Sequence, residues 1–139
     1  MKTESALTSK AIKSELKKAF PNVKFSVKSS NFAGGNSVDV SYDDAILRSK
    51  VKAITDKYQY GSFDGMNDIY NYDNKNESIP QVKYVSVSRN MSDETSAELL
   101  KEFQNTYKGA EKLTMNDYHQ DSLGYVSNVV YIMFIEREF

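Results

Sequence analysis

Apolar residues recur at helical spacing in the first segment of the chain. Ile12, Leu16 and Phe20 fall on one side of residues 3–20, and lysines fall on the other side. This spacing is that of an amphipathic helix with one face packed on a core. Pro21 ends the segment, because the residue before a proline avoids the helical region of backbone space. The sequence therefore predicts a helix over residues 3–20.

The two segments that follow alternate between apolar and polar residues. Residues 24–28 alternate around two apolar side chains, and residues 37–42 alternate around three. A period of two is that of a strand with one buried face, so the two segments predict a β-hairpin. Gly34 and Gly35 lie in the connecting segment, where they permit positive φ. Phe32 precedes them, and it is either folded onto the sheet or offered to a partner.

A second helix is predicted to begin at Asp43 and Asp44, because carboxylates accept hydrogen bonds from the free N–H groups of a first helical turn. Apolar residues at helical spacing continue it. A short strand at residues 69–72 and an exposed loop at residues 73–80 follow. The strand predicted at residues 82–89 carries apolar side chains on both sides, so we expect it to be covered on much of both faces.

The last part of the chain predicts one more helix and one more strand. Ser92 or Asp93 caps the helix, and Gly109 is its expected stop. Residues 125–135, YVSNVVYIMFI, are a β-branched and aromatic run that suits an interior strand. The order α-β-β-α-β-β-α-β predicts an α+β fold with a mostly antiparallel sheet and helices packed on one face. We expect residues 1–139 to form a single domain.

Composition excludes several kinds of chemistry. The chain has no cysteine and one histidine, which excludes a disulfide framework, a thiolate metal site and a cysteine nucleophile. The glycine patterns of a nucleophile elbow, a P-loop and a dinucleotide-binding turn are missing from the sequence. We therefore expect no enzymatic activity, no cofactor and no metal ion.

The net charge of −1 is unevenly spread along the chain. Residues 1–28 carry seven lysines and two glutamates, whereas residues 93–121 carry seven acids and three lysines. Such asymmetry can mark one face for an acidic partner and another for a basic one, although the solvated faces of two surface helices are the simpler explanation. Lys10, Lys13 and Lys17 form a basic stripe on the first helix, and they are the candidate contacts for a nucleic acid.

Two features bear on the location of the protein. The N-terminal segment is dense with lysine and lacks the apolar run of a signal peptide. The most apolar segment, residues 125–135, has about half the length that a membrane-spanning helix needs. We therefore expect a soluble, cytoplasmic protein.

Aromatic and acidic residues gather in the middle of the chain. Five tyrosine or phenylalanine residues lie between Tyr58 and Tyr72. Aromatic side chains supply much of the binding energy at protein interfaces. The candidate partner-contact residues are aromatic or acidic: Phe32, Asp64, Asp68, Tyr70, Tyr72 and Asp73.

Four segments in combination resemble a known family. AFPNVKFSV, NSVDVSY, SFDGMNDIY and VKYVSVSR are similar to the large polyvalent protein-associated domain that is twenty-ninth in its numbered series. The resemblance covers residues 11–89, and residues 90–139 are expected to complete the domain with one helix and one central strand. Such domains occur in phages, plasmids and other bacterial mobile elements, often within very large proteins. No catalytic residues are established for the family.

The resemblance implies a function in the conflict between mobile elements and their hosts. A small, free-standing domain of this kind is similar in size and composition to anti-CRISPR inhibitors of the type II-A class. It implies a non-enzymatic protein that binds and blocks the Cas9 nuclease, with or without guide RNA, in the cytoplasm of a bacterial host. The alternative is a nucleic-acid-binding accessory module that acts through Lys10, Lys13 and Lys17. The sequence leaves open whether the chain forms a homo-oligomer.

Overall fold

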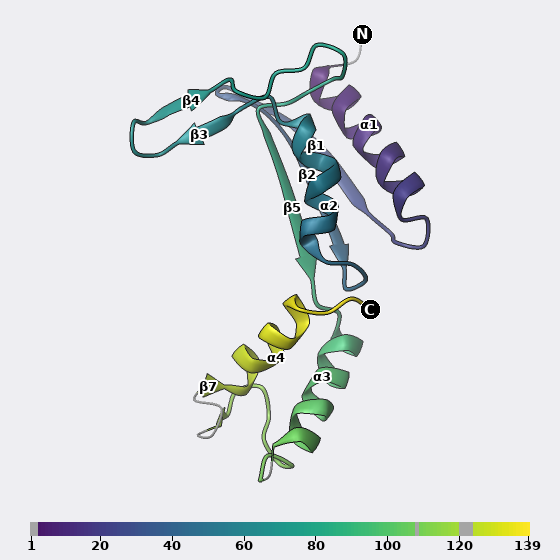
Figure 1. The fold of residues 1–139 in the computed structure, drawn as a ribbon, viewed down its shortest axis with the longest axis vertical. Coiled ribbons are helices and arrows are strands. Elements are labelled where there is room, and N and C mark those ends of the chain that lie inside the picture. The colour runs from purple at the N-terminus through teal and green to yellow at the C-terminus, as the bar shows by residue number, and fades with distance from the viewer. Residues whose placement is uncertain (1–2, 108, 120–123) are drawn as a thin grey trace. The chain divides into compact units, whose positions relative to one another are not determined.

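The computed structural model describes residues 3–107, 109–119 and 124–139 (Figure 1). Contacts between residues group the chain into two compact units. Unit 1 consists of the residues up to Tyr42 together with Arg48–Arg89. Unit 2 consists of Asp43–Leu47 together with the residues from Asn90 onward.

Unit 1 contains a helix, a hairpin and a second helix before its remaining strands. Its elements are α1 (Glu4–Ala19), β1 (Ser26–Phe32), β2 (Gly35–Asp43), α2 (Arg48–Thr55), the 3-10 helix η1 (Asp56–Tyr58), β3 (Ser62–Asp64), β4 (Ile69–Asn71) and β5 (Tyr84–Asn90). α1 begins at Thr3, whose hydroxyl accepts a hydrogen bond from the Ala6 N–H. The helix predicted from residue 3 is therefore confirmed. Ser5 Oγ of α1 donates a 3.0 Å hydrogen bond to Asn31 Oδ1 of β1.

The three-stranded sheet of unit 1 has the order β1-β2-β5. β1 and β2 form the predicted antiparallel hairpin, in which Phe32 lies opposite Gly35. β5 lies on the other side of β2 and points in the same direction, so the sheet is mixed (Figure 1). The antiparallel pairings of β1 with β2, β3 with β4 and β6 (Tyr118–His119) with β7 (Gly124–Tyr125) agree with the predicted mostly antiparallel arrangement, to which β5 adds a parallel neighbour of β2. The chain passes through α2 and the β3–β4 segment after β2, and this long connection returns it to the end of the sheet at which β2 began.

The two faces of this sheet differ in exposure. The buried apolar side chains of unit 1 are Ile12, Leu16, Val38, Val40, Tyr42, Val51, Tyr58, Val82 and Val87. On β5, Val87 belongs to this core, whereas Tyr84, Ser86 and Ser88 at alternate positions are exposed. The prediction that this strand is covered on both faces is wrong. α1 and α2 cover one face of the sheet, and the other face meets solvent.

β5 lies at an edge of the sheet, and two side chains form hydrogen bonds with its outer backbone groups. Gln59 Oε1 accepts a 2.8 Å hydrogen bond from the Val85 N–H. The Arg48 Nε group donates a 2.7 Å hydrogen bond to the Val87 carbonyl oxygen. These bonds take the place of those that a further strand would make.

β3 and β4 form a separate two-stranded hairpin that projects from the rest of unit 1 (Figure 1). Phe63 lies opposite Tyr70 across this hairpin, so the two side chains share a face. Gly61 precedes β3 in a tight space, because a Cβ atom there would lie 2.1 Å from the Asn71 carbonyl oxygen. β4 corresponds to the strand predicted at residues 69–72.

Unit 2 contains two helices joined through two short strands. Its elements after Asn90 are α3 (Asp93–Thr106), β6 (Tyr118–His119), β7 (Gly124–Tyr125) and α4 (Val126–Ile135). Ser92 is the N-cap of α3, as predicted, and its hydroxyl accepts a hydrogen bond from the Thr95 N–H.

The central strand predicted at residues 125–135 is wrong, because α4 occupies almost all of this segment. Val126, Val130 and Phe134 repeat at steps of four and are buried. The buried cluster of unit 2 combines residues of both helices and their connection: Leu99, Phe103, Ala110, Val126, Val130 and Phe134. Packing against α3 therefore stabilises a helix in a segment whose residue types favour a strand.

Asp43 and Asp44 do not begin α2, contrary to the prediction. Positive φ angles at Asp44 (49°) and Ala45 (48°) turn the chain, and α2 begins only at Arg48. The Asp44 carboxylate accepts two hydrogen bonds from Ser92, one from its N–H at 3.0 Å and one from its hydroxyl at 2.6 Å. Within unit 2, Asp44 therefore supports the N-cap of α3.

Helices and strands both contribute to the fold, so the predicted α+β class is confirmed. None of the helices in the described ranges combines the length and the apolar character that crossing a membrane requires.

Candidate functional site

Three tyrosines pack together where the β3–β4 hairpin joins the rest of unit 1. The rings of Tyr60 and Tyr72 are stacked, with centroids 5.5 Å apart and an interplanar angle of 13°. Tyr70 meets both rings edge-on, at 5.9 Å from Tyr60 and 5.1 Å from Tyr72. These are favourable geometries for aromatic pairs, so the base of the hairpin has a defined packing.

The cluster continues onto the exposed face of the sheet. Tyr84 on β5 meets Tyr70 edge-on at 5.8 Å, and Phe32 at the end of β1 stacks on Tyr84 at 6.4 Å. Phe32 lies opposite Gly35, which has no side chain to separate the two rings. Phe32 is therefore folded onto the sheet, and 48% of its surface remains exposed.

Tyr70 holds the centre of this arrangement. Its hydroxyl donates a 2.6 Å hydrogen bond to the Lys83 carbonyl oxygen. Burial raises the pKa of Tyr70 to about 12, and the neighbouring rings of Tyr60, Tyr84 and Tyr72 contribute to the increase. The hydroxyl therefore stays protonated, and a donor, throughout the neutral range.

Lys83 places a positive charge within the cluster. Its Nζ atom lies 5.1 Å from the ring centre of Tyr70 and 5.7 Å from that of Tyr84, which are cation–π distances. Nζ also donates a 2.9 Å hydrogen bond to the Gly34 carbonyl oxygen. The stem of Lys83 fills the space beside Gly35, where a Cβ atom would lie 2.7 Å from Lys83 Cδ.

The outer rings of the cluster are exposed to solvent. Phe32 is 48% exposed and Tyr72 is 64% exposed. Phe63, on the same side of the hairpin as Tyr70, is 55% exposed. We define the aromatic face as these rings and the ones beneath them: Phe32, Tyr60, Phe63, Tyr70, Tyr72 and Tyr84.

Asp64 is committed to the turn of the hairpin. Its Oδ2 accepts a 2.8 Å hydrogen bond from the Asn67 side chain, and its Oδ1 accepts a 3.0 Å bond from the Met66 N–H. The bond from the Asn67 side chain, with the backbone bonds from Met66 and Asn67, lowers the pKa of Asp64. Asp64 therefore shapes the tip that carries Met66, which is 97% exposed.

The other two predicted acids lie at opposite ends of the hairpin. Asp68 is exposed in the turn with a φ of 51°. Asp73 follows β4, and its Oδ2 accepts a 3.0 Å hydrogen bond from Ser62 Oγ. Across the described ranges, no three carboxylate or imidazole groups come together in a cluster that could hold a metal ion.

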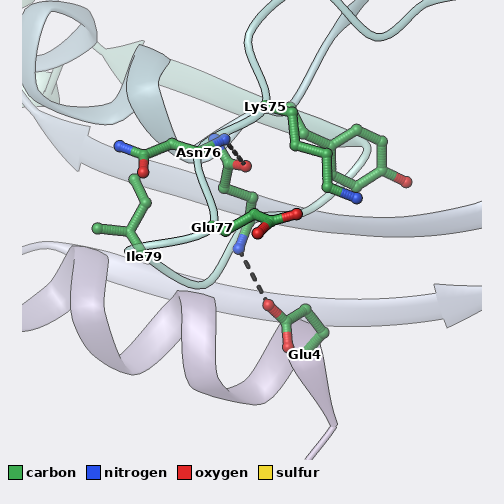
Figure 2. A pocket seen from close by; sticks show the side chains of 7 residues that line it. Glu4, Lys75, Asn76, Glu77 and Ile79 are labelled. Carbon is green, nitrogen blue, oxygen red and sulfur yellow. Dashed lines mark hydrogen bonds between the residues drawn. The ribbon is translucent and has the colours of Figure 1, made fainter.

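A pocket of about 370 Å³ lies beside Tyr60. Figure 2 shows Glu4 reaching into it from α1, and Lys75 and Glu77 from the loop after β4. Its lining residues are Glu4, Tyr60, Lys75, Asn76, Glu77, Ile79 and Gln81. The pocket therefore combines an aromatic wall with groups of both charges.

Gln81 organises the wall of this pocket from within the protein. It is 5% exposed. Its amide donates to the carbonyl oxygens of Lys57 and Asn74 and accepts from the Asn76 N–H. Its own N–H donates to Glu4 Oε1 at 3.3 Å (Figure 2). These bonds assign Gln81 to holding the loop in place.

The lysine stripe lies elsewhere in unit 1. Lys10, Lys13 and Lys17 are all exposed on α1, as the helical spacing predicts. The structure thus separates the two sets of candidate residues, since none of these lysines belongs to the aromatic face or lines the pocket.

The structure brings together three of the predicted contact residues, Phe32, Tyr70 and Tyr72, in one aromatic surface. Tyr84 and Lys83 also belong to it, and sequence reasoning missed both. Their signal is the pattern of β5, in which an aromatic residue and serines occupy one face of a strand whose other face is apolar.

The fold and this surface define an α+β protein that presents an ordered, exposed group of aromatic rings. Residues 3–95 match the family described as large polyvalent protein associated domain 29, and the chain belongs to this family. It is thus a domain of the polyvalent proteins of phages and other mobile elements. The match includes the whole aromatic face and ends in α3. No curated protein and no solved structure matches the chain significantly.

Proposed function

We propose that this protein is a non-catalytic counter-defence protein that binds a bacterial defence nuclease. Cas9 loaded with guide RNA is the first candidate, and the protein would block it as an anti-CRISPR inhibitor by occupying a surface. The observation that carries the proposal is the aromatic face, in which Phe32, Phe63 and Tyr72 are each about half exposed or more.

The aromatic face has the properties of a protein-binding surface. Exposed apolar patches on soluble proteins mark interaction sites. Tyrosine is enriched among the residues that dominate binding energy, and fixed rings lose little entropy on binding. Tyr70 fixes the rings here through its contacts with Tyr60, Tyr72 and Tyr84.

Membership of a mobile-element family supports a counter-defence role. Proteins of phages and plasmids act in hosts that carry defence nucleases, and an inhibitor of such a nuclease would meet it in the bacterial cytoplasm. A binding role also agrees with the polar groups of unit 1. Asp64 holds a turn and Gln81 holds a loop, so both serve the shape of the molecule.

The test combines capture of the nuclease with a cleavage assay. Tagged protein is incubated with Cas9 alone, with Cas9 and guide RNA, and with the same complex bound to target DNA. We expect a stable complex with at least one of these forms, and inhibition that is complete near one protein per nuclease. Turnover of a substrate by this chain, or the failure of every form to bind, would refute the proposal.

Alanine variants test whether the aromatic face is the surface that binds the nuclease. Tyr72→Ala and Phe32→Ala should each weaken inhibition about tenfold or more, as is usual for central aromatic contacts. Tyr131→Ala is the matched control, because Tyr131 is an exposed tyrosine (56%) of unit 2 outside the aromatic face. Circular dichroism must show that the variants stay folded. Equal inhibition by all three variants would place the contact elsewhere.

A nucleic-acid-binding accessory module is the second candidate function. The observation that favours it is the exposure of Lys10, Lys13 and Lys17 along α1. Binding through these residues should weaken steeply with salt. The slope of log affinity against log salt concentration reports the number of phosphate contacts, and replacing the three lysines by glutamine should lower that number by about three. Binding that ignores salt, or no binding to DNA and RNA, would eliminate this function.

A further inference from the structure

Three rings of the aromatic face, Phe63, Tyr70 and Tyr72, lie in an acidic segment. Residues 62–77 contain four carboxylates and one lysine, so this segment carries a net negative charge. The four acids are Asp64, Asp68, Asp73 and Glu77. Rings with a negative face beside carboxylates attract positively charged groups from a partner.

The cluster already binds one cation of its own. Lys83 Nζ lies over the rings of Tyr70 and Tyr84. Tyr72 and Phe63 are more exposed than Tyr84, and in the described ranges no cation lies over either ring. The same kind of contact is therefore open to a cation that comes from outside the chain.

The pocket beside Tyr60 extends this surface. Glu4 and Glu77 supply two carboxylates against the one ammonium of Lys75, while Tyr60 and Ile79 supply apolar walls (Figure 2). A volume of about 370 Å³ is near the lower end for ligand pockets, which suits one long side chain. Tyr60 also stacks on Tyr72, so the pocket adjoins the aromatic face.

We propose that the aromatic face and this pocket bind a basic, arginine-bearing segment of a protein partner. One guanidinium stacks on the exposed ring of Tyr72, and another enters the pocket between Glu4 and Glu77. Arginine suits the site better than lysine, because its planar group stacks on rings and pairs with a carboxylate through two hydrogen bonds. This inference names the chemistry of the partner, and it rests on the proposed function.

A second copy of the chain is a poor source of these arginines. The chain has three, Arg48, Arg89 and Arg137. Arg48 bonds to the backbone of β5, Arg137 pairs with Glu102 at 2.6 Å, and Arg89 also makes contacts of its own. Nucleic acid is disfavoured as well, because the net negative charge of residues 62–77 would repel its phosphates.

Peptide titration tests the inference without any nuclease. The intact protein, labelled with nitrogen-15, is titrated with a short peptide of alternating glycine and arginine. The same peptide with lysine, the same peptide with glutamine and a short oligothymidylate are the comparison ligands. We expect arginine to bind more tightly than lysine and glutamine to bind negligibly, with the largest amide shifts at Tyr60, Tyr72 and Glu77.

Charge and ring variants define the site. Glu77→Gln and Tyr72→Ala should each weaken arginine-peptide binding about fivefold, which corresponds to one cation–π or ion-pair contact. Glu94→Gln and Tyr131→Ala are the matched controls in unit 2, and they should bind as the unaltered protein does.

Several results would overturn the inference. These are equal binding of the glutamine peptide, no arginine-peptide binding at millimolar concentration, tighter binding of the oligonucleotide to the same residues, and a dimer in sedimentation analysis that Tyr72→Ala dissociates. Peptide binding without Cas9 binding would leave this inference standing and refute the choice of partner.

Discussion

Tyr70 and Lys83 hold each other through two different contacts. The Tyr70 hydroxyl donates to the Lys83 carbonyl oxygen at 2.6 Å, and the Lys83 ammonium lies 5.1 Å from the centre of the Tyr70 ring. Because Tyr70 belongs to β4 and Lys83 immediately precedes β5, these contacts join the projecting hairpin to the sheet. The orientation of the aromatic face therefore depends on this pair.

Removing the Tyr70 hydroxyl should loosen the hairpin. Tyr70→Phe deletes the hydrogen bond to Lys83 but keeps the ring, so we expect a loss of about 1 kcal/mol in the free energy of unfolding. Urea denaturation measures it. Tyr131→Phe is the control, and as a surface change it should stay within about 0.5 kcal/mol of the unaltered protein. Equal stability of both variants would show that the Tyr70 bond does not contribute.

Two glycines of the hairpin should respond differently to alanine. At Gly61 a Cβ atom would lie 2.1 Å from the Asn71 carbonyl oxygen and 2.4 Å from Tyr70 Cε1, so the hairpin must move. At Gly65 the same atom would meet only Phe63 Cε1, at 3.9 Å. Gly61→Ala should therefore destabilise unit 1 by about 2 kcal/mol or more, and Gly65→Ala by much less. Thermal unfolding compares the two, and similar melting temperatures would contradict the tight packing at Gly61.

Tyr58 and Tyr70 should be the last tyrosines to ionise. Burial raises the pKa of both to about 12; the bond that Tyr58 donates to Glu15 adds to its shift, and the nearby rings add to that of Tyr70. Unfolded tyrosine has a pKa of about 10, so the folded state binds more protons between these values. The contribution of these two hydroxyls to the free energy of unfolding is therefore complete below about pH 10, and it is lost as the pH rises towards 12.

Ultraviolet titration of tyrosinate checks this expectation. The unaltered protein should show two late-ionising groups, and Tyr58→Phe and Tyr70→Phe should each remove one of them. Ionisation of all ten tyrosines in one step near pH 10, with the protein still folded, would contradict the burial of these hydroxyls.

Substitutions at Asp64 and Asp68 should have different effects, the first on the structure of the hairpin and the second on partner binding. Asp64→Ala removes the acceptor of three hydrogen bonds in the turn, so we expect larger amide shifts throughout β3 and β4 and a weaker hairpin. Asp68→Asn keeps a residue that tolerates the φ of 51° and removes only a charge. It should leave stability unchanged and weaken partner binding modestly. Nuclear magnetic resonance spectra report the structure of the hairpin in each variant, and a binding assay reports its affinity for the partner. A disordered hairpin in Asp68→Asn would contradict the expectation that Asp68 contributes only a charge.

The bond between Asp44 and Ser92 should appear as coupling in unit 2. Ser92→Ala removes the N-cap of α3 and should cost about 1 kcal/mol, and Asp44→Ala should cost a similar amount. The double variant should cost less than the sum of the two, because both single changes break the same contact. Additive losses in urea denaturation would show that the two residues act independently.

Periodicity predicted the elements whose apolar residues occupy a single face. α1 and the β1–β2 hairpin follow this rule, whereas the cap at Ser92 was predicted from its residue type. α4 does not, because apolar residues fill nearly all of its positions and hide the period. Val129 and Val130 favour a strand by residue type, and only the packing of the segment against Leu99 and Phe103 selects the helix.

The candidate site was predictable where its residues are close in sequence. Tyr70 and Tyr72 stand together in the chain, and both lie in the aromatic face. Tyr84 and Lys83 join it because β5 pairs with β2 across a long connection, and local patterns carry no information about that pairing. The Asp44 turn was missed for the opposite reason, since acids suit helix starts and turns alike.

The hydrogen bonds from the Gln59 and Arg48 side chains to the backbone of β5 limit how this protein can assemble. Growth of a fibre by lateral addition needs two vacant sides on every subunit, and here the three-stranded sheet offers one, along β1. Two molecules that joined along β1 would leave no vacant edge of this sheet for a third molecule, so assembly through the three-stranded sheet should end at a pair.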